Sequence, residues 1–540
     1  MDRRTYLGLV GVAVASVAGC VTQRPDDTDT ATPPPPPPQT PTTRTPRLDE
    51  FERVDVVSDL GCDPTGDEPC VSKLQAGLAD GVALEFPAGT YRFEDRLDIS
   101  GHTGIALVGV GAGSVNVVPP KGFNSVLVDV GSTDRFIMRG IDIDITANDT
   151  TAGIRVLCRK WFEIDDVEFV GRGTHPDDDV VHALLAGLTE ASGRGLIRNF
   201  RATKGSAIGH YKDGDGRAGI SIGPWNFGTI RIEDCHLEEF GNNGIYASRT
   251  SGNVEVVGGL FRNNNVASIR ISGNGSYVSG ATVEVDLGSY TGPLTQLDSQ
   301  FNTRGIAIEQ GPADKPPGVE IRDCTIRIEE TPRSKGGIYI FPTGRTVTVR
   351  NTTIQVNVDE VPAVYRSVLE PQGQYEPAEA PHWINLENVE ITGRARGAAG
   401  VVLYDAPESV IRNCTIDQSG TDRDGVYLTN SVSTTIDGGS ISTSRYPVVV
   451  ELTNEREREA CLLQFESVPE LQTRGDGGAF ASGSTVRIEA NEYRVDGGGV
   501  VGPVECLAVN DFDPVVDGDD TLAITGTRDG NVEWLRFVAR

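Results

Sequence analysis

Lysine is scarce in this 540-residue chain, which has seven lysines among its 48 basic residues. Acidic residues number 77, so the formal net charge is −29 at pH 7. A surface that binds the phosphates of nucleic acids needs the opposite sign of charge. The composition therefore predicts that nucleic acid is not a partner of this protein.

Long apolar runs, zinc-site spacings and collagen-like repeats are also missing. The apolar run Leu7–Gly19 has 13 residues, whereas a helix that spans a bilayer needs about 20. The cysteines lack the close Cys/His spacing of a zinc site, and the 64 glycines follow no three-residue period. With 38% hydrophobic residues the chain can still form a core, so the composition indicates a turn-rich globular protein.

The first fifty residues have the features of an export signal and a tether. The arginine pair at 3–4 makes residues 1–19 resemble a twin-arginine signal, and residues 17–20 resemble a lipobox. Cys20 is therefore expected to be lipidated as the mature N-terminus. Residues 20–50 are rich in threonine and proline, which favours an extended spacer. We expect an exported protein, lipid-anchored to the outer face of the cytoplasmic membrane.

The excess of acid and the preference for arginine resemble the composition of proteins from salt-loving archaea. At a salt concentration of about 1 M the Debye length is about 3 Å, so surface charges there mainly keep a protein hydrated. The alternative interpretation is an ordinary acidic secreted protein.

Export would place the remaining cysteines in an environment that permits disulfides. Cys62 and Cys70 stand eight residues apart in a loop rich in glycine, proline and aspartate, so a small disulfide ring is expected there. Cys461 and Cys506 are a second candidate pair, whose connectivity the sequence leaves open.

A short segment recurs seven times along the chain. Each copy has a glycine, then isoleucine or valine, a variable residue and a second apolar residue, which is the period-2 pattern of a half-buried strand. We expect the glycine to supply a turn conformation that other residues avoid. The copies cover residues 151–156, 217–222, 242–247, 303–308, 335–340, 398–403 and 423–428.

A second motif, with Asp or Asn at its centre, precedes several of these strands at 232–237, 321–326, 349–354 and 411–416. Asp and Asn tolerate the left-handed turn between two strands. The spacings from Asn351 to Asn388, Asn413 and Gly438 are 37, 25 and 25 residues, within the range of about 20 to 50 that marks solenoids. Short strands at this interval predict an all-β parallel β-helix, whose coils bury their apolar faces by stacking.

The start of this region resembles the pectate-lyase-like superfamily of right-handed parallel β-helices. Residues 73–78 resemble the short capping helix of that superfamily, and residues 84–93 resemble its "PAGTY" strand. The resemblance covers roughly residues 51–460. It implies an N-terminal cap with the first coils over 51–110 and a right-handed β-helix over 111–460. Short β patterns continue over 461–540, where we expect a β-rich C-terminal cap.

Side chains two places after each repeated glycine are expected to point outward on one long parallel sheet. Three of these seven side chains are tyrosines, and the positions two places further on add more rings. Aromatic faces suit the apolar faces of sugars, although tyrosine also favours strands for structural reasons. The predicted substrate-binding residues are Arg155, Tyr246, Tyr339, Phe341, Tyr404 and Tyr427.

Chemistry on a glycan needs charged groups beside these rings. The richest cluster is residues 210–217, where Asp213 and Asp215 alternate with glycines and could bind Ca²⁺. Asp-Gly-Asp-Gly is also ordinary turn chemistry. The predicted acid or base residues are His210, Lys212, Arg217 and Glu309, and Arg249, Arg304, Asp405 and Asp424 are further candidates on or beside the repeated strands.

A second charged cluster, at residues 175–182, contains two histidines and three aspartates, and the simpler interpretation is a solvated acidic loop. Known enzyme motifs of the superfamily do not match: the His-Gly and Arg-x-Lys motifs of polygalacturonases are missing, and Val450 replaces the second arginine of the pectate lyase motif.

The leading hypothesis is a cell-surface protein that binds a polysaccharide and cleaves it as a lyase or a glycoside hydrolase. The alternative is a non-catalytic glycan-binding or structural surface protein.

Overall fold

The computed structural model describes residues 48–176, 180–208, 216–293, 302–309, 315–371, 375–431, 434–445 and 448–452, together with separate strands between 463 and 539. The chain divides into two units, Met1–Thr45 and Pro46–Arg540, and all described residues belong to the second. The predicted signal, lipidation site Cys20 and most of the spacer lie outside the described residues. Over the part of the chain that is described, the structure contains no helix long and apolar enough to cross a membrane.

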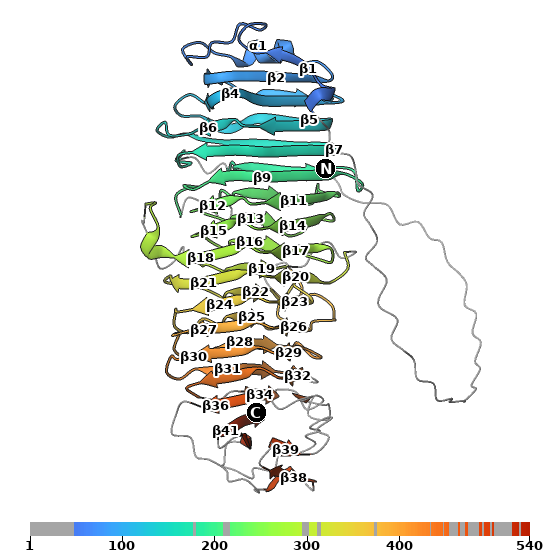
Figure 1. Ribbon diagram of the computed structural model, residues 1–540, viewed down its shortest axis with the longest axis vertical. Coiled ribbons are helices and arrows are strands. Elements are labelled where there is room, and N and C mark those ends of the chain that lie inside the picture. Colours follow the sequence, from blue (N-terminus) through green and yellow to red (C-terminus); the bar gives the residue numbers. More distant parts are fainter. Residues whose placement is uncertain are drawn as a thin grey trace, which may run out of the picture. The chain divides into compact units, whose positions relative to one another are not determined.

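The second unit is a stack of parallel strands (Figure 1). Its N-terminal end begins with a short 3-10 helix and a single α-helix, α1, which lies beyond the first coil and buries Val71 and Leu74. Long strands follow, each bending around a coil. These first elements are η1 (Leu48–Glu50), β1 (Glu52–Asp55), α1 (Val71–Gly77), β2 (Val82–Arg92), β3 (Leu97–Ser100), β4 (Ile105–Val118), β5 (Asn124–Arg139), β6 (Asp142–Asp144) and β7 (Thr151–Val170).

Beyond β7 the coils form three columns of short strands. The first column carries the repeated glycine segments and pairs in parallel from coil to coil. It consists of β8 (Leu184–Leu188), β10 (Ile220–Ile222), β13 (Ile245–Ala247), β16 (Ile269–Ile271), β19 (Ile306–Ile308), β22 (Ile338–Ile340), β25 (Val364–Arg366), β28 (Ala399–Tyr404), β31 (Asp424–Thr429) and β34 (Val448–Leu452).

The second and third columns complete each coil. The second is β9 (Arg194–Ala202), β11 (Thr229–Glu233), β14 (Asn253–Val257), β17 (Ser276–Ser279), β20 (Val319–Arg322), β23 (Val347–Arg350), β26 (Ile384–Glu387), β29 (Val410–Arg412), β32 (Thr434–Asp437) and β35 (Leu463–Gln464). The third starts from the end of β9 and continues with β12 (His236–Glu238), β15 (Leu260–Arg262), β18 (Thr282–Asp286) followed by η2 (Leu287–Ser289), β21 (Thr325–Glu330), β24 (Thr353–Val356), β27 (Glu390–Gly393), β30 (Thr415–Gln418), β33 (Ser440–Thr443) and β36 (Glu470–Thr473).

The core runs through the inside of the coils as one continuous apolar cluster that extends from Val56 to Val448. Strands alternate buried and more exposed side chains, because successive residues of a strand point to opposite faces. The predicted all-β, right-handed parallel β-helix with a short N-terminal capping helix is confirmed.

The C-terminal part is also β-structure, as predicted. β40 (Thr521–Arg528) and β41 (Asn531–Ala539) form an antiparallel hairpin, and β41 pairs in parallel with β34 of the first column. The remaining strands, β37 (Thr485–Ile488), β38 (Asn491–Asp496) and β39 (Gly499–Val501), form a small antiparallel sheet.

The repeated glycines have a different role from the one predicted. None of the seven has a left-handed backbone conformation; instead, a Cβ atom at six of them would lie 3.0 Å or less from a backbone carbonyl oxygen of the next coil. Close approach between coils, rather than turn geometry, therefore excludes a side chain there. These six are Gly153, Gly219, Gly244, Gly305, Gly337 and Gly400.

The central Asp or Asn of the second motif does take the left-handed conformation that was predicted. The φ angles are 51° at Asp234, 56° at Asp323, 47° at Asn351 and 51° at Asn413. Side-chain amides also join successive turns, since Asn351 Nδ2 donates to Asp323 Oδ1 at 3.2 Å. The turn between the second and third columns is thus repeated from coil to coil.

Candidate functional site

The predicted metal site lies outside the described residues, because His210, Lys212, Asp213 and Asp215 all fall in the segment 209–215. Within the described ranges, no group of three or more His, Cys, Asp or Glu side chains is arranged to hold a metal ion. The expected Ca²⁺ site therefore stays a prediction.

Arg217, a predicted catalytic residue, is buried at the edge of the first column. One terminal nitrogen donates to the carbonyl oxygens of Ala152 at 2.9 Å and Val181 at 2.6 Å, and the guanidinium lies over the ring of Phe169. Burial lowers its pKa to about 9. The structure does not bring Arg217 together with Glu309, because β10 and β19 are three strand spacings apart, which is about 14 Å.

His182, from the second charged cluster, is held neutral beside Arg217. Burial lowers the pKa of His182 to about 4, the charge of Arg217 adds to this, and the ring Nδ1 lies 3.2 Å from the Ala218 N–H, which it accepts only when unprotonated. Between about pH 6.5 and pH 4 the unfolded chain binds a proton at this residue and the folded chain does not.

The free energy of unfolding is therefore expected to fall as the pH decreases from about 6.5 to about 4. Because the His182 side chain is partly exposed, its contribution to this fall is about 2 kcal/mol. Replacing His182 by Gln keeps an acceptor for the Ala218 N–H and should make stability depend less on pH between about 6.5 and 4. Urea unfolding midpoints across the pH range measure the difference. Equal slopes for the wild type and the variant would contradict the assignment.

Arg155, a predicted substrate-binding residue, is occupied by an ion pair. Its guanidinium binds both carboxylate oxygens of Asp129, at 2.6 and 2.8 Å, and Arg96 approaches the same carboxylate at 3.4 Å. By register Arg155 lies in the same outward row as Tyr246 but three strands toward the N-terminus. It is separate from the aromatic rings described next.

The predicted aromatic row exists and is longer than the sequence suggested. Register places Tyr246, Arg270, Ala307, Tyr339, Tyr365, Val402 and Tyr427 at equivalent outward positions of β13, β16, β19, β22, β25, β28 and β31. Phe341 and Tyr404 lie two residues further on. Ring centroids are 4.7 Å apart for Tyr339 and Phe341, 5.4 Å for Tyr339 and Tyr365, 6.1 Å for Tyr365 and Tyr404, and 6.4 Å for Tyr404 and Tyr427.

The row is not uniformly exposed. Tyr339 and Phe341 are only 3% and 8% exposed, because arginine side chains cover them. Arg304 lies over both rings, at 4.8 and 5.1 Å, and Arg270 lies over Phe341 at 4.7 Å and over Tyr246 at 5.1 Å. Cation–π contacts of this kind strengthen where the groups are desolvated. The rings and the arginines therefore form one surface.

Two arginines bind one carboxylate at this place, and a third arginine lies over the neighbouring rings. Arg270 binds Glu309 through two nitrogens, at 2.8 and 3.1 Å, and Arg249 binds it at 3.2 Å. Ser248 donates a short hydrogen bond to the same carboxylate. Arg304 contacts the rings beside it. We refer to Arg249, Arg270, Arg304 and Glu309 as the arginine cluster.

Glu309, predicted as an acid or base, is an ionised carboxylate that positions guanidinium groups. Burial alone would raise its pKa, but the charges of Arg270 and Arg249 and the hydrogen bond from Ser248 bring that pKa below its ordinary value. Both carboxylate oxygens already accept hydrogen bonds from arginine. The structure therefore shows Glu309 holding the two arginines in place.

Arg304 contributes a positive charge without a carboxylate partner among the described residues. One terminal nitrogen donates to the carbonyl oxygens of Val266 and Asn302, at 2.9 and 3.1 Å, and its Nε has no hydrogen-bond partner in the described part of the chain. Burial lowers its pKa to about 10, so the group is still charged at neutral pH. Three arginines against one glutamate give the arginine cluster a net charge of +2, in a chain whose total is −29.

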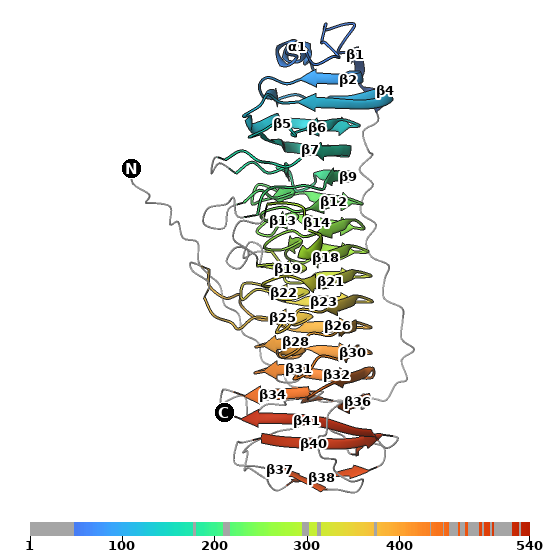
Figure 2. The same ribbon diagram turned by 90° about the vertical axis from the view of Figure 1, so that its left-hand side faces the viewer.

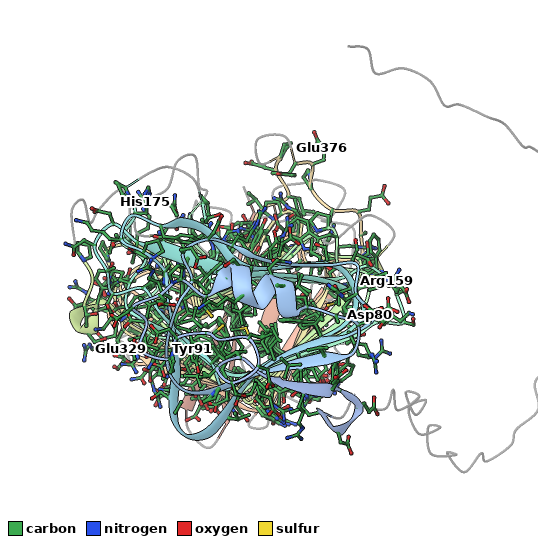
Figure 3. The ribbon with its side chains drawn as sticks, turned by 90° about the horizontal axis from the view of Figure 1, so that it is seen from above. Asp80, Tyr91, Arg159, His175, Glu329 and Glu376 are labelled. Atoms are coloured by element: carbon green, nitrogen blue, oxygen red, sulfur yellow. The ribbon has the colours of Figure 1, made fainter. Side chains whose placement is uncertain are left out.

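A loop between β25 and β26 adds one more ring to this surface. Tyr375 is 38% exposed, its hydroxyl accepts a hydrogen bond from Arg249 at 2.8 Å, and the Arg249 guanidinium lies 4.3 Å from its ring centre. Figure 2 shows this loop extending to one side of the stack, and seen down the stack the neighbouring Glu376 projects on the same side as His175 (Figure 3).

Several of these residues were not found from the sequence. Arg270 and Tyr365 occupy the outward row, but their strands begin Ser-Ile and Ala-Val and lack the repeated glycine. Aligning the apolar pair Ile269/Ile271 with the other strands could have found Arg270, whereas the strand of Tyr365 has only Val364 as an apolar flank because residue 366 is an arginine. Tyr375 stands in a loop, where no strand pattern marks it.

The other two further candidates have structural roles. Asp405 is in the left-handed conformation, with φ at 50°, and accepts hydrogen bonds from the Leu369 N–H and from Asn430. Asp424 is buried and lies 3.6 Å from Arg445. Both stabilise turns next to the first column.

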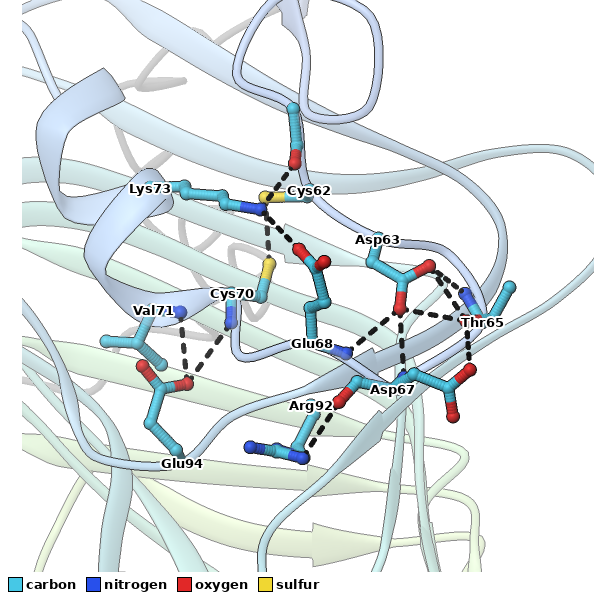
Figure 4. Close-up of polar contacts among 11 residues, drawn as sticks. Cys62, Asp63, Thr65, Asp67, Glu68, Cys70, Val71, Lys73, Arg92 and Glu94 are labelled. Carbon is cyan, nitrogen blue, oxygen red and sulfur yellow. Dashed lines mark hydrogen bonds and ion pairs between the residues drawn. The ribbon is translucent and has the colours of Figure 1, made fainter.

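The predicted disulfide pair lies at the N-terminal cap (Figure 4). The sulfur atoms of Cys62 and Cys70 are 2.8 Å apart, and both residues are buried. Around them, Lys73 Nζ donates to the Gly61 carbonyl at 2.6 Å. Hydrogen bonds from the backbone of Thr65 and Glu68 lower the pKa of Asp63 to about 2 and fix the loop between the cysteines.

The Cys62 and Cys70 thiols are therefore expected to oxidise to a disulfide in an oxidising environment. Closing a loop of this size stabilises the fold by about 2.5 kcal/mol in the chain-entropy model. The intact mass should rise by two hydrogens on reduction, and Cys70→Ser should lower the unfolding midpoint. Cys235, buried without a nearby thiol among the described residues, is the matched control for labelling. Alkylation of Cys62 and Cys70 without reductant to the same extent as Cys235 would contradict the prediction.

Comparisons with known proteins show similarity of fold. No protein-family model matches the chain, and no curated protein sequence matches it. Among solved structures, the A-module of mannuronan C-5 epimerase AlgE6 from Azotobacter vinelandii has a TM-score of 0.42 and 16% identity, covering 71% of this chain and 97% of that one. PfbA, a surface adhesin of Streptococcus pneumoniae, has a TM-score of 0.39 and 12% identity, covering 83% and 99%. A family 28 exopolygalacturonase of Yersinia enterocolitica has a TM-score of 0.32 and 10% identity, covering 79% of each chain.

Proposed function

We propose that this protein binds an acidic polysaccharide along the outer side of the first column between β13 and β31. The observation that carries the proposal is the arginine cluster, which places a net charge of +2 among stacked aromatic rings on one face of a strongly acidic protein. Guanidinium groups bind carboxylates and sulfates through paired hydrogen bonds. Aromatic rings supply flat apolar surfaces for the sugar rings between the charged groups.

Binding through partly buried arginines withstands high salt better than long-range electrostatic attraction does. Exposed charges further apart than about 3 Å are largely screened at about 1 M salt, whereas partly buried charges are screened much less. Arg270 has 13% of its side chain exposed, and Arg304 is 7% exposed. Binding is therefore expected to depend on direct contact with the arginine cluster and to persist in molar salt.

The described geometry supports binding more directly than hydrolysis. A glycoside hydrolase needs two carboxylates about 5 to 9.5 Å apart, one of them able to donate a proton. Glu309 is ionised and bound by two arginines. Cleavage by elimination with Ca²⁺ at Asp213 and Asp215 is a separate proposal, which rests on the sequence.

The test is a binding panel with the full chain in molar salt. Polygalacturonate, alginate and dextran sulfate are the acidic probes, and dextran and mannan are the neutral ones. Saturable binding of at least one acidic probe, with no binding of the neutral probes, is the expected result. Equal binding of acidic and neutral probes, or binding of neither, would overturn the proposal. The same samples with added Ca²⁺, examined for unsaturated products, test elimination.

We also propose that the protein is exported and held at the cell surface by a lipid on Cys20. The support is the sequence of residues 1–20. Replacing Cys20 by alanine should move the protein from the membrane fraction to the medium. An unchanged distribution between the two fractions would count against the lipid anchor.

A further inference from the structure

A tryptophan lies flat on the first column next to the arginine cluster. Trp225 belongs to the turn after β10, and its indole spans two glycines, Gly187 after Ala186 and Gly223 after Ile222. A Cβ atom on Gly223 would lie 2.5, 2.6 and 2.8 Å from three adjacent carbons of the six-membered ring. Nearly equal distances to adjacent ring atoms place that Cβ position over the face of the ring, so the glycines let the indole rest on the backbone.

The other face of the indole is available to solvent. Trp225 is 37% exposed, which is high for a tryptophan held against a sheet. Its indole N–H already donates to the Ala186 carbonyl at 3.3 Å. The free part of the side chain is therefore the apolar ring face.

The turn that carries Trp225 is firmly anchored. The next residue, Asn226, is fully buried; its Oδ1 accepts from the Leu188 N–H at 3.1 Å and its Nδ2 donates to Thr250 at 3.0 Å. Thr250 belongs to the turn of the following coil. These hydrogen bonds fix the position of Trp225 before any ligand arrives, which lowers the entropy cost of binding.

Register connects this ring to the arginine cluster. β10 pairs with β13 so that Ser221 lies beside Tyr246, which sets Gly223 beside Ser248. Ser248 donates to Glu309 of the arginine cluster. The ring over Gly223 is thus one strand spacing, about 4.8 Å, from the coil that carries Ser248 and Arg249.

We propose that Trp225 is a stacking platform for a sugar ring of the same acidic polysaccharide that the arginine cluster binds. This inference rests on the proposed function. The C–H face of a pyranose is apolar and fits an indole face, while the carboxylate or sulfate of a neighbouring sugar reaches the arginines. The occupant is a sugar because the exposed ring face continues the aromatic row and its N–H is already used.

The test compares three variants in binding of polygalacturonate, alginate and dextran sulfate in molar salt. Trp225→Ala should weaken the binding of the probe that the wild type binds by about tenfold, which is about 1.4 kcal/mol. Gly223→Ala keeps the tryptophan, but its new Cβ atom would clash with the face of the indole and displace it. This variant should therefore weaken binding to a similar extent. Phe227→Ala, in the same turn and 48% exposed, is the matched control and should bind like the wild type.

Tryptophan fluorescence gives a second readout. The bound polysaccharide should change the emission of the wild type and of Phe227→Ala, and this change should be lost in Trp225→Ala, although Trp161, Trp383 and Trp534 remain. Thermal unfolding of each variant shows whether it is folded. A folded Trp225→Ala that binds like the wild type would overturn the platform and leave the arginine cluster standing. Binding of no acidic probe by the wild type would overturn both proposals.

Discussion

Replacing both Arg249 and Arg270 by alanine is expected to weaken binding of an acidic polysaccharide by about a hundredfold or more. The change removes two of the three positive charges, so the net charge of the arginine cluster falls from +2 to 0. Removing a charged partner from a desolvated contact costs about 2–5 kcal/mol, and a hundredfold change corresponds to about 2.7 kcal/mol. Titration calorimetry in molar salt measures the loss.

A matched control exists on the second column. Arg231 resembles Arg249 in its contacts: it lies 3.4 Å from Glu255 and donates to the Tyr277 hydroxyl at 3.1 Å. The two arginine side chains are also similarly exposed, at 38% for Arg231 and 36% for Arg249. Arg322 lies over the Tyr277 ring at 4.5 Å.

Replacing Arg231 and Arg322 together by alanine removes the same charge from another face and should leave binding unchanged. If this control lost as much affinity as the double variant of the arginine cluster, binding would depend on overall charge, and the proposed site would be wrong. If the variant with both Arg249 and Arg270 replaced by alanine bound like the wild type, the proposed site would also be wrong.

The second large effect concerns stability. Arg423 is completely buried and joins three coils: its Nε donates to Gln418 at 2.8 Å, and its two terminal nitrogens donate to the carbonyl oxygens of Gly397 at 2.7 Å and Val361 at 2.9 Å. Burial lowers its pKa to about 10, so it is charged in the folded protein at neutral pH. Arg423→Ala leaves these three acceptors without their donor and opens a cavity, which should cost about 3–5 kcal/mol.

The urea unfolding midpoint, followed by circular dichroism at fixed salt and pH, measures this loss. Arg396 is the comparison: it pairs with Asp359, but its side chain is 67% exposed. Arg396→Ala should therefore shift the unfolding midpoint far less than Arg423→Ala does, as is usual for a surface ion pair. Equal effects of the two substitutions would show that the buried arginine does not hold the coils together.

Most of the fold could be predicted because its pattern is local and repeated. Each coil repeats an apolar alternation that has to face the core, and each Asn or Asp turn has a conformation that few residues tolerate. The reason for the repeated glycines was mistaken, since a contact with the neighbouring coil leaves no mark within a single strand. Gly219, for example, faces the carbonyl oxygen of Gly244, which is 25 residues away.

The candidate site was only partly predictable, because it depends on which side chains meet across coils. Tyr246, Tyr339 and Phe341 follow from the strand pattern, but their contacts with Arg270 and Arg304 join residues up to 71 positions apart, from Arg270 to Phe341, and follow from the register between strands. Trp225 stands in a turn two residues after Gly223, and only the structure shows that its ring lies on the outer face. Positions of this kind are fixed by tertiary packing.

The regular pairing of the first column has a consequence for how a polymer is held. From β13 to β31 the strands pair in register, so side chains repeat at about 4.7–4.9 Å. Rings recur along this repeat, whereas the described strands here contain the arginine cluster once. A polymer can therefore stack at many offsets, but only offsets that bring a charged sugar onto these arginines bind tightly. With n such offsets along a chain, affinity gains a statistical term of RT ln n, so charge density along the polymer sets the strength of binding even when every individual contact is the same.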